Sequence, residues 1–191
     1  MEHFYNENIF GENWFDYSEL YKSQVNKAID GSHFVEVGSW KGRSSAFMAV
    51  EIINSGKKIK FDCVDTWTGT EDLNEKASVP EYQNDPAILN NSLYDVFLKN
   101  NEKVLHIINP IKMSSTKASL LYENESLDFV FIDACHTYDC VDADIKAWLP
   151  KIKIGGMLCG HDAGYRPIDL AVAHNLPGNI KSGSCWLYNK I

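Results

Sequence analysis

The sequence of 191 residues lacks the features that mark several large classes of protein. It has no run of Lys and Arg that would form a basic stripe, and its formal net charge of -8 would repel a phosphate backbone. A nucleic-acid substrate is therefore disfavoured. No segment approaches the length of a membrane span, and the N-terminus has neither the basic start nor the apolar stretch of a signal peptide. We therefore expect a soluble, cytoplasmic protein with no membrane partner.

Cysteine pairs at the usual metal-binding or redox spacing are also absent. The five cysteines are odd in number, show no CxxC spacing and lie mostly in apolar runs. They are Cys63, Cys135, Cys140, Cys159 and Cys185. We interpret them as small buried side chains of a protein in a reducing compartment.

The composition of the chain predicts a single domain that covers residues 1–191. Hydrophobic residues make up 45% and charged residues 23%, which is enough apolar material to bury a core in one compact unit. Residues 1–32 form an aromatic-rich extension, in which we predict a helix over residues 16–29. These aromatic side chains would cap the core, roof a substrate pocket or form the contact of a homodimer.

Apolar runs alternate with helix-like segments between residues 33 and 161, which predicts an α/β fold with a parallel sheet and helices on both faces. Strands are expected at 33–37, 59–64, 104–108, 127–132 and 157–159, with a last strand at 184–188 near an edge of the sheet. The strand at 104–108 is expected to stop before Pro110. The polar segment 66–84 follows a strand end directly, so we predict a lid loop there.

Two helices are predicted between these strands. One covers the apolar stretch 44–53. The other places Val141, Ile145 and Trp148 on one face and leaves Asp144 with the polar residues of the opposite side. This helix is expected to end at Pro150, and the glycine pair 155–156 is expected to turn the chain into the next strand.

The first strand runs into Glu36-x-Gly38-x-x-x-Gly42 and then into a helix. Gly38 permits a close backbone approach, and a helix N-terminus offers unpaired N–H groups. The pattern is not GxGxxG, and a carboxylate stands where a pyrophosphate would approach. Glu36 therefore suits a ligand with a cationic amine, such as the methionine part of S-adenosylmethionine. The alternative is that both glycines only make a tight turn.

The second strand ends at Asp65, where a carboxylate is able to accept hydrogen bonds from both ribose hydroxyls of a nucleoside. Its alternative role is a cap of a loop. Trp40 and Trp67 each follow a strand end, so each would stack on an adenine ring or pack into the core.

Polar side chains also follow the fourth and fifth predicted strands. They are Asp133, His136, His161 and Asp162. Because the carboxyl ends of parallel strands meet at one edge of a sheet, we expect these side chains to converge. In one interpretation, His136 or His161 takes a proton from an attacking hydroxyl. In another, Asp133 and Asp162, with His161, hold a divalent cation. In a third, the cluster only orients its loops.

Taken together, these stretches resemble the class I S-adenosylmethionine-dependent methyltransferases, particularly the macrocin-type sugar O-methyltransferases. The resemblance covers about residues 14–165. It rests on the stretches 34–45, 64–67, 131–138 and 148–162.

The resemblance implies a Rossmann-like three-layer sandwich with a mostly parallel seven-stranded sheet and an antiparallel last strand. It implies that S-adenosylmethionine binds along the strand ends. The implied binding residues are Glu36, Gly38, Ser39, Trp40, Gly42, Ser44, Asp65, Trp67, Ser114 and Asp133. Asp65 would hold the ribose and Ser114 would approach the adenine.

In metal-dependent relatives similar to catechol O-methyltransferase, the acid ending the fourth strand and two residues after the fifth strand bind magnesium. The matching positions here are Asp133, His161 and Asp162, so the resemblance implies a site for Mg or another divalent cation. His161 departs from the usual carboxylate at its position.

The function expected from the sequence is methylation of a hydroxyl on a small polar or sugar-like metabolite, with Asp133 and His136 as the catalytic pair. Two alternatives remain at this point. One is a non-catalytic S-adenosylmethionine binder or dimerisation module, and the other is a nicotinamide-dependent oxidoreductase.

Overall fold

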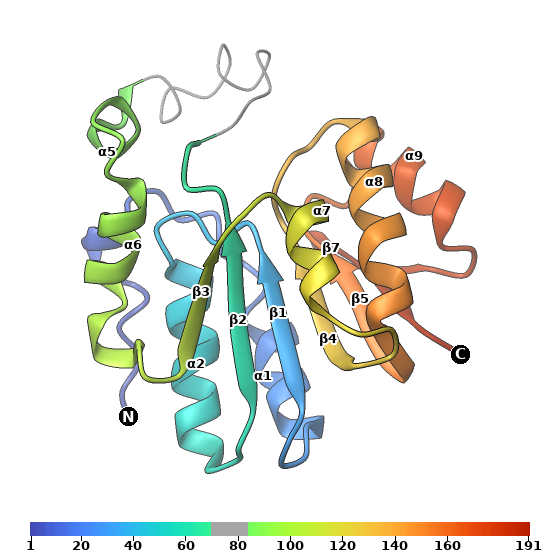
Figure 1. Cartoon of the computed structure of the whole chain (residues 1–191), viewed down its shortest axis with the longest axis horizontal. Coiled ribbons are helices and arrows are strands. Elements are labelled where there is room, and N and C mark those ends of the chain that lie inside the picture. The colour runs from blue at the N-terminus through green and yellow to red at the C-terminus, as the bar shows by residue number, and fades with distance from the viewer. Residues whose placement is uncertain (70–83) are drawn as a thin grey trace.

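The computed structural model describes residues 1–69 and 84–191, and the elements named below belong to that part of the chain. Its strands form a seven-stranded sheet with the order β3-β2-β1-β4-β5-β7-β6. They are β1 (His33–Val37), β2 (Lys60–Asp65), β3 (Ile108–Lys112), β4 (Leu127–Ile132), β5 (Ile152–Gly160), β6 (Ile180–Ser182) and β7 (Cys185–Asn189). Strands β1 to β5 run parallel, whereas β7 is antiparallel to both β5 and β6 (Figure 1). The predicted sheet with an antiparallel last strand is confirmed.

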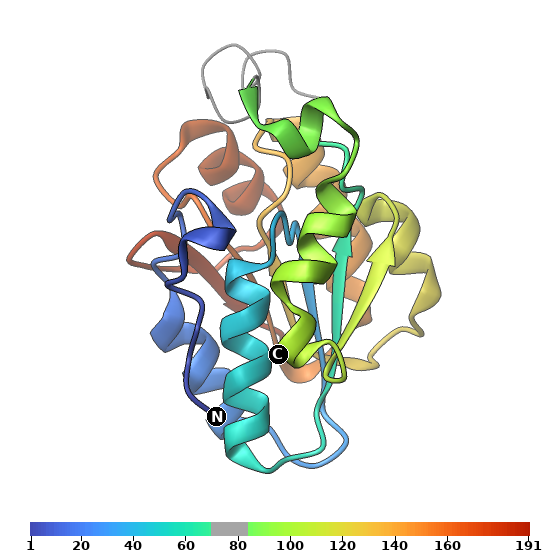
Figure 2. The same cartoon turned by 90° about the vertical axis from the view of Figure 1, so that its left-hand side faces the viewer.

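Helices cover both faces of this sheet, which produces the three layers of a Rossmann-like sandwich (Figure 1, Figure 2). One face is covered by α1 (Ser18–Lys27), α2 (Arg43–Ser55) and α6 (Leu93–Asn100), and the other by α7 (Ser115–Ala118), α8 (Tyr138–Trp148) and α9 (Arg166–Asn175). Shorter elements are α5 (Pro86–Leu89), η1 (Asn8–Phe10), η2 (Glu102–Val104), η3 (Ser119–Leu121) and η4 (Leu149–Lys151). The layered architecture is the predicted one.

The strands are apolar along most of their length because both of their faces are buried. In β1, Phe34 belongs to the core cluster under α1 and α2, whereas Val35 belongs to the cluster under α8. Side chains alternate between the faces of a strand, so Glu36 points the same way as Phe34. The carboxylate of Glu36 therefore faces α1 and α2.

Strand β3 lies later in the sequence than predicted. The chain forms the turn η2 (Glu102–Val104) where the strand was expected to begin, and it enters the sheet only at Ile108. Pro110 sits in the middle of β3, opposite Cys63 of β2. Since β3 is the edge strand of the described sheet, the missing N–H of the proline does not interrupt a pairing on its outer side.

The predicted glycine turn before β5 is also wrong. Strand β5 begins at Ile152, so Gly155 and Gly156 lie inside it. The register between β4 and β5 shifts at this point, and Gly155 has a φ of 81°. An irregularity of this kind inside a strand is a common place for glycine. The preceding helix ends at Trp148, and Pro150 lies in the turn η4.

The remaining elements follow the sequence predictions closely. Helices α1 and α2 lie at the expected positions, and β7 lies beside the edge strand β6. Residues 70–83, which make up most of the predicted lid loop, fall outside the described residues.

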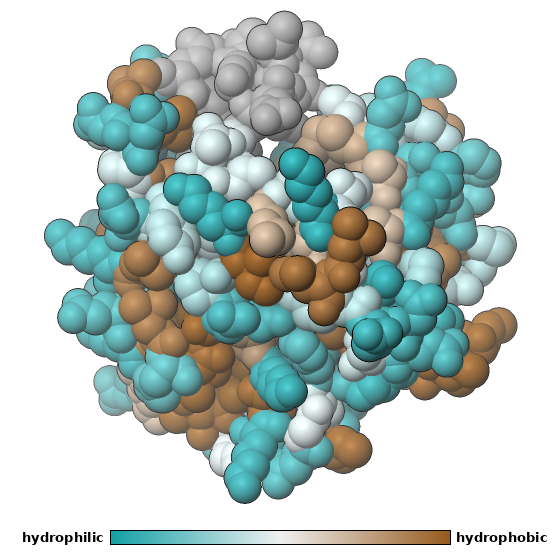
Figure 3. Space-filling model, viewed as in Figure 1, coloured by the Kyte–Doolittle hydropathy of each residue, from teal (hydrophilic) through white to brown (hydrophobic). Residues whose placement is uncertain are grey.

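The surface of the molecule is mixed in character. In the face shown in Figure 3, hydrophilic side chains predominate and apolar side chains gather in separate patches. Among the described residues, no helix is long and apolar enough to cross a membrane.

Candidate active site

A cavity of about 1120 Å³ lies at the carboxyl edge of the parallel strands. Its wall contains residues that follow β1, β2, β4 and β5, together with part of the N-terminal extension. Open α/β sheets bind ligands at this edge because the strand ends and the helix N-termini converge there. The predicted residues in its wall are Gly38, Ser39, Trp40, Ser44, Asp65, Ser114, Asp133, His136, His161 and Asp162.

The turn after β1 is built around Gly38. Its φ is 90°, and its N–H donates to the carbonyl of Val64 at 2.8 Å. A Cβ atom at this position would collide with the backbone of Asp133 and Ala134. Only glycine fits, because the backbone that follows β4 passes directly over the turn.

Gly42 has a different function. It is the N-cap of α2, with a φ of 88°, and a Cβ atom there would collide with the side chains of Asn101 and Phe97. Gly42 is absent from the described residues that line the cavity. The structure therefore places it as a packing residue under the turn.

Glu36 lies behind the turn. Its side chain accepts hydrogen bonds from the hydroxyl groups of Tyr21, at 2.8 Å, and Ser45. Burial raises the pKa of the Glu36 carboxyl, while these hydrogen bonds oppose the increase. Glu36 is 1% exposed and is not among the described residues of the cavity wall. The predicted direct contact with a cationic amine does not fit this placement, because the carboxylate points toward α1 and α2.

Asp65 ends β2 and lines the cavity. Its Oδ2 accepts from the N–H of Trp40 at 2.8 Å, and its Oδ1 accepts from the N–H of Trp67 at 2.7 Å. Burial raises the pKa of Asp65, and these backbone donors oppose the increase. Both oxygens are therefore held in place by backbone donors, which also include the N–H groups of Ser39 and Thr66.

The two tryptophans separate into different roles. Trp67 is 2% exposed, donates through Nε1 to the carbonyl of Trp40 at 2.9 Å, and packs against Tyr94 and Phe97. Trp67 is thus a packing residue. Trp40 lines the cavity, and its ring centre lies 6.1 Å from that of Trp14.

A buried acid that was expected on the polar side of its helix lies beside Ser115. Asp144 is 4% exposed and lines the cavity. Burial raises its pKa to about 6, while a hydrogen bond with Ser115 opposes the increase. The Ser115 hydroxyl is itself held by Trp148 Nε1 at 2.9 Å. The spacing of Asp144 from Val141 and Trp148, three and four residues, would have indicated the inward face of the helix.

The predicted cluster at the ends of β4 and β5 does form. His136 Nε2 lies 3.0 Å from Asp162 Oδ2 and 3.7 Å from Asp133 Oδ1. Burial raises the pKa of the Asp162 carboxyl, but the hydrogen bond with His136 and the neighbouring His161 outweigh it, so the pKa lies below its usual range.

His161, which was predicted as a metal ligand together with Asp133 and Asp162, lies beside both of these carboxylates. Its Nδ1 is 3.3 Å from Asp162 Oδ1, and its Nε2 is 3.0 Å from Asp16 Oδ1. Burial lowers the pKa of His161, but Asp162, Asp133 and Asp16 together outweigh burial and raise it to about 9. Among the described residues, the potential ligand atoms that lie within 4.8 Å of one another belong to Asp133, His136 and Asp162. His161 Nδ1 also lies 3.9 Å from Asp133 Oδ1, so both histidines face the two carboxylates, and His136 is the one whose nitrogen belongs to this close set of ligand atoms.

Two consecutive residues of the N-terminal extension complete this side of the cavity. The Tyr17 hydroxyl donates to Asp133 Oδ2 at 3.2 Å, and the Tyr17 ring lies 5.0 Å from that of His161. Asp16 accepts from His161 and from the hydroxyl of Ser184, the latter at 2.6 Å. The extension thus packs into the core and also lines the cavity. No motif in the sequence pointed to Asp16 or Tyr17 individually.

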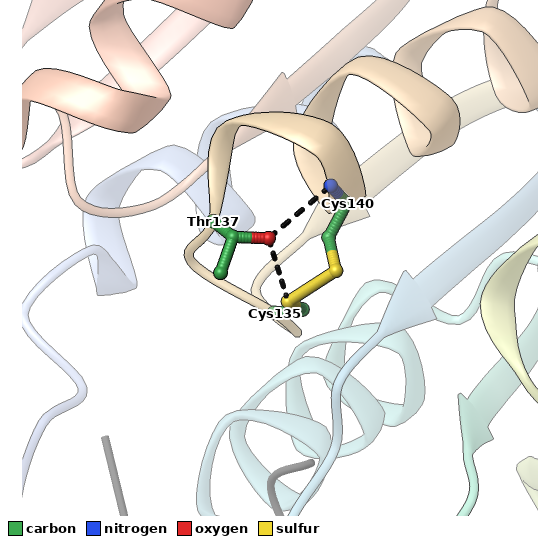
Figure 4. Close-up of a disulfide and its surroundings, with 3 residues drawn as sticks. All are labelled: Cys135, Thr137 and Cys140. Atoms are coloured by element: carbon green, nitrogen blue, oxygen red, sulfur yellow. Dashed lines mark hydrogen bonds between the residues drawn. A yellow bond between two sulfur atoms is a disulfide. The ribbon is translucent and has the colours of Figure 1, made fainter. Parts of the chain in front are cut away.

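Two of the cysteines were interpreted wrongly. Cys135 and Cys140 form a disulfide at the start of α8 (Figure 4). Both residues line the cavity. The other three cysteines, Cys63, Cys159 and Cys185, are free and buried, as predicted. A spacing of five residues across a helix N-terminus brings the Cα atoms of Cys135 and Cys140 within 5.8 Å, which is a normal separation for a disulfide.

A family model of a methyltransferase domain matches residues 35–163. A curated relative from Sinorhizobium fredii (strain NBRC 101917 / NGR234), the uncharacterized protein y4gI, is 24% identical over 141 residues. That match covers 73% of this chain and 14% of the relative, so the chain spans about a seventh of the length of that relative.

Solved structures with the same fold include several methyltransferases. The O-methyltransferase NovP is 16% identical with a TM-score of 0.63, covering 91% of this chain and 78% of NovP. An S-adenosylmethionine-dependent methyltransferase from Aquifex aeolicus is 14% identical with a TM-score of 0.54, covering 91% and 87%. An S-adenosylmethionine-dependent O-methyltransferase from Thermotoga maritima is 11% identical with a TM-score of 0.55, covering 91% and 64%.

The matched domain spans all of the strand ends that build the cavity, from the turn after β1 to Asp162 after β5. This chain belongs to the class I S-adenosylmethionine-dependent methyltransferases.

Proposed function

We propose that this protein transfers a methyl group from S-adenosylmethionine to a hydroxyl oxygen of a small polar, sugar-like acceptor. One observation carries the proposal. A single cavity joins the Gly38 turn and Asp65 to the cluster of Asp133, His136 and Asp162. The first group suits a nucleoside donor, and the second suits activation of a hydroxyl.

The donor side would bind S-adenosylmethionine along the ends of β1, β2 and β3. Asp65 would accept the ribose hydroxyls, since backbone donors already fix its oxygens. Ser39, Trp40 and Ser44 would lie along the methionine part. Ser114, and with it Asp144, would face the adenine, whose exocyclic amine is a suitable donor to a buried carboxylate.

The acceptor side would supply orientation and a base. When bound, the donor supplies an electrophilic methyl carbon attached to a sulfonium. The acceptor oxygen forms a bond to this carbon, the carbon–sulfur bond breaks, and its electron pair stays on sulfur. His136 would take the hydroxyl proton, and the Asp162 carboxylate 3.0 Å away would stabilise the resulting charge. Asp133 would orient the oxygen. His161 does not suit the role of base, because each of its ring nitrogens already faces a carboxylate.

A divalent cation would fit the same cluster. Asp133, His136 and Asp162 offer two carboxylates and an imidazole, a mixed set that accommodates Mn or another first-row ion as well as Mg. Bound there, the cation would lower the pKa of the acceptor hydroxyl, with His136 as a ligand rather than a base.

The charge of the cavity wall bears on the acceptor class. Its acidic residues are Glu12, Asp16, Asp65, Asp133, Asp139, Asp144 and Asp162, whereas Arg43 is the one Lys or Arg among the described lining residues. Arg43 already donates to the carbonyls of Tyr5 and Gly11. An acceptor with phosphate groups would be repelled, which supports a neutral or cationic metabolite.

Titration calorimetry with S-adenosylhomocysteine and, separately, with NAD tests the donor. Heat with S-adenosylhomocysteine alone is the expected result, and heat with NAD alone would replace the proposal with an oxidoreductase. A screen of hydroxylated metabolites with labelled S-adenosylmethionine tests transfer. Product formation with chelator present would remove the cation from the reaction and leave His136 as the base. Binding without transfer to any hydroxyl compound would favour the non-catalytic binding module.

A further inference from the structure

The disulfide in the cavity wall has no part in the reaction proposed above. Cys135 lies two residues after Asp133, and Cys140 lies in the first turn of α8. Both residues are half-buried and line the cavity, so a small molecule entering the cavity is able to reach the bond. The three other cysteines are buried and free, and none of them lines the cavity among the described residues.

The bond closes a short covalent ring over residues 135–140, and this ring contains His136. Without the bond, the segment keeps weaker local restraints. The Thr137 hydroxyl accepts from the N–H of Cys140 at 3.3 Å and lies 3.4 Å from the sulfur of Cys135 (Figure 4). The bond therefore restricts the loop that holds His136 near Asp162.

The same loop also forms the roof of the donor turn. The backbone of Asp133 and Ala134 presses on Gly38 so closely that no Cβ atom fits between them. If residues 134–137 became less rigid, both the turn at Gly38 and the position of His136 would therefore be affected. When the cavity wall is already rigid in the free protein, less conformational entropy is lost on binding, and the affinity is higher.

We propose that Cys135 and Cys140 form a thiol–disulfide exchange site for low-molecular-weight thiols, and that the state of this site sets the affinity for the methyl donor. This inference rests on the proposed function for its second half. The disulfide form is the state that binds the donor more tightly, because the covalent ring keeps the wall ordered.

The exchange balances with two equivalents of thiol. The thiolate of one small thiol attacks one protein sulfur, forms a mixed disulfide and releases the other cysteine as a thiolate. A second small thiol attacks the mixed disulfide and releases the remaining cysteine. The products are two protein thiols and one small-molecule disulfide, so two electrons and two protons pass to the protein. The reverse reaction uses the small-molecule disulfide as the oxidant.

The first measurement follows the exchange itself. The native protein is equilibrated with reduced and oxidised glutathione at a series of ratios, and the exchange is then quenched with acid. Free thiols are alkylated, the protein is digested, and the masses of the peptides are measured by mass spectrometry. The peptide with Cys135 and Cys140 is expected to pass from the disulfide to the doubly alkylated form as the thiol fraction rises. A pair that is fully reduced or fully oxidised at every ratio would overturn the exchange site.

The second measurement follows S-adenosylhomocysteine by calorimetry. Reduction is expected to raise its Kd about three- to tenfold, the range expected when a wall must be ordered on binding. The variant with both Cys135→Ser and Cys140→Ser is expected to bind like the reduced protein and to be insensitive to glutathione, which controls for the buried cysteines. An equal Kd in both states of the parent overturns the coupling but leaves the proposed function intact. Absence of binding in both states overturns the proposed function instead.

Discussion

The donor side and the acceptor side of the cavity are held together in different ways. On the donor side, Asp65 is fixed by the backbone N–H groups of Trp40 and Trp67, which are 25 and 2 residues away in the sequence. On the acceptor side, Tyr17 binds Asp133 across 116 residues, and Asp16 binds Ser184 across 168 residues. The carboxylate of the donor side is therefore held by strand-to-helix connections that are near one another in the sequence, whereas the acceptor cluster is held in addition by the two ends of the chain.

This difference indicates which part of the protein is free to change. Local backbone geometry tolerates few substitutions, so the donor side is constrained by its own turn. Side-chain contacts between distant segments change with each substitution in either segment. The acceptor side is thus suited to vary in specificity while the donor side stays the same.

The largest expected effect is at the point where the two sides touch. Gly38→Ala places a Cβ atom against the backbone after β4 in a residue with a φ of 90°. We expect a loss of about 3 kcal/mol or more in the free energy of unfolding, measured by urea denaturation.

Gly31→Ala is the matched control for this substitution. Gly31 has a φ of 91°, but no atom lies within 4 Å of the point that its Cβ atom would occupy, so the control isolates the cost of the backbone conformation. We expect a loss of about 1 kcal/mol there. Equal losses in the two variants would show that the contact between the turn and the residues after β4 contributes nothing to the free energy of unfolding.

Asp65→Ala tests whether the donor side depends on its backbone-held carboxylate. The substitution removes the acceptor for the backbone N–H groups and, in the proposed function, for the ribose hydroxyls. We expect the Kd for S-adenosylhomocysteine to rise about 30- to 100-fold, because hydrogen bonds to a charged group are among the strong ones. Asp95→Ala, an exposed acid of α6, is the control and should leave the Kd unchanged. Tight binding by Asp65→Ala would remove the ribose assignment.

Asp144 is a buried acid on the donor side that lowers the stability of the folded protein when it is ionised. Because its pKa in the folded protein is about 6 and its ordinary value is 3.8, the folded protein keeps the proton between these pH values while the unfolded chain loses it. The free energy of unfolding therefore falls by about 2 to 3 kcal/mol as the pH rises through this window. The destabilisation by Asp144 is complete above about pH 6.

Asp144→Asn removes this titration and should be the more stable protein at about pH 8, by about 2 kcal/mol, with little difference from the parent at about pH 4. Urea denaturation at both pH values measures the change, and Asp95→Asn serves as the exposed control. A parent protein whose stability is flat between about pH 4 and 7 would contradict a buried, uncharged Asp144.

The sequence was a good guide to the donor side for the same reason that this side is local. Glycine positions and an acid at a strand end are properties of neighbouring residues, so Gly38 and Asp65 were predicted from the sequence, and both line the cavity. The predicted contact of Glu36 with a ligand amine does not fit the structure, because the alternation of side chains in β1 turns the carboxylate away from the cavity. The edge position of β3, which accommodates Pro110, depends on the order of the whole sheet and is not visible in a local pattern.

The acceptor side was only half predictable. Asp133, His136 and Asp162 were expected to converge, since all three follow parallel strands. Their partners Asp16, Tyr17 and Ser184 come from the two ends of the chain, and no local signal links them. The disulfide was missed because a spacing of five residues is not a recognised cysteine motif, and only the geometry of the α8 N-terminus brings the two sulfurs together.

The smallest expected effect tests whether the acceptor side is independent of the donor side. Tyr17→Phe keeps the ring that packs against Phe131 and His161 and removes only the hydroxyl that donates to Asp133. We expect about 1 kcal/mol of lost stability, the usual contribution of one hydrogen bond, and a change of less than about twofold in the Kd for S-adenosylhomocysteine. Urea denaturation and calorimetry measure the two quantities on the same sample. A tenfold weaker Kd would show that Asp133 couples the sides through its backbone contact with Gly38, in which case acceptor specificity would not change without cost to donor binding.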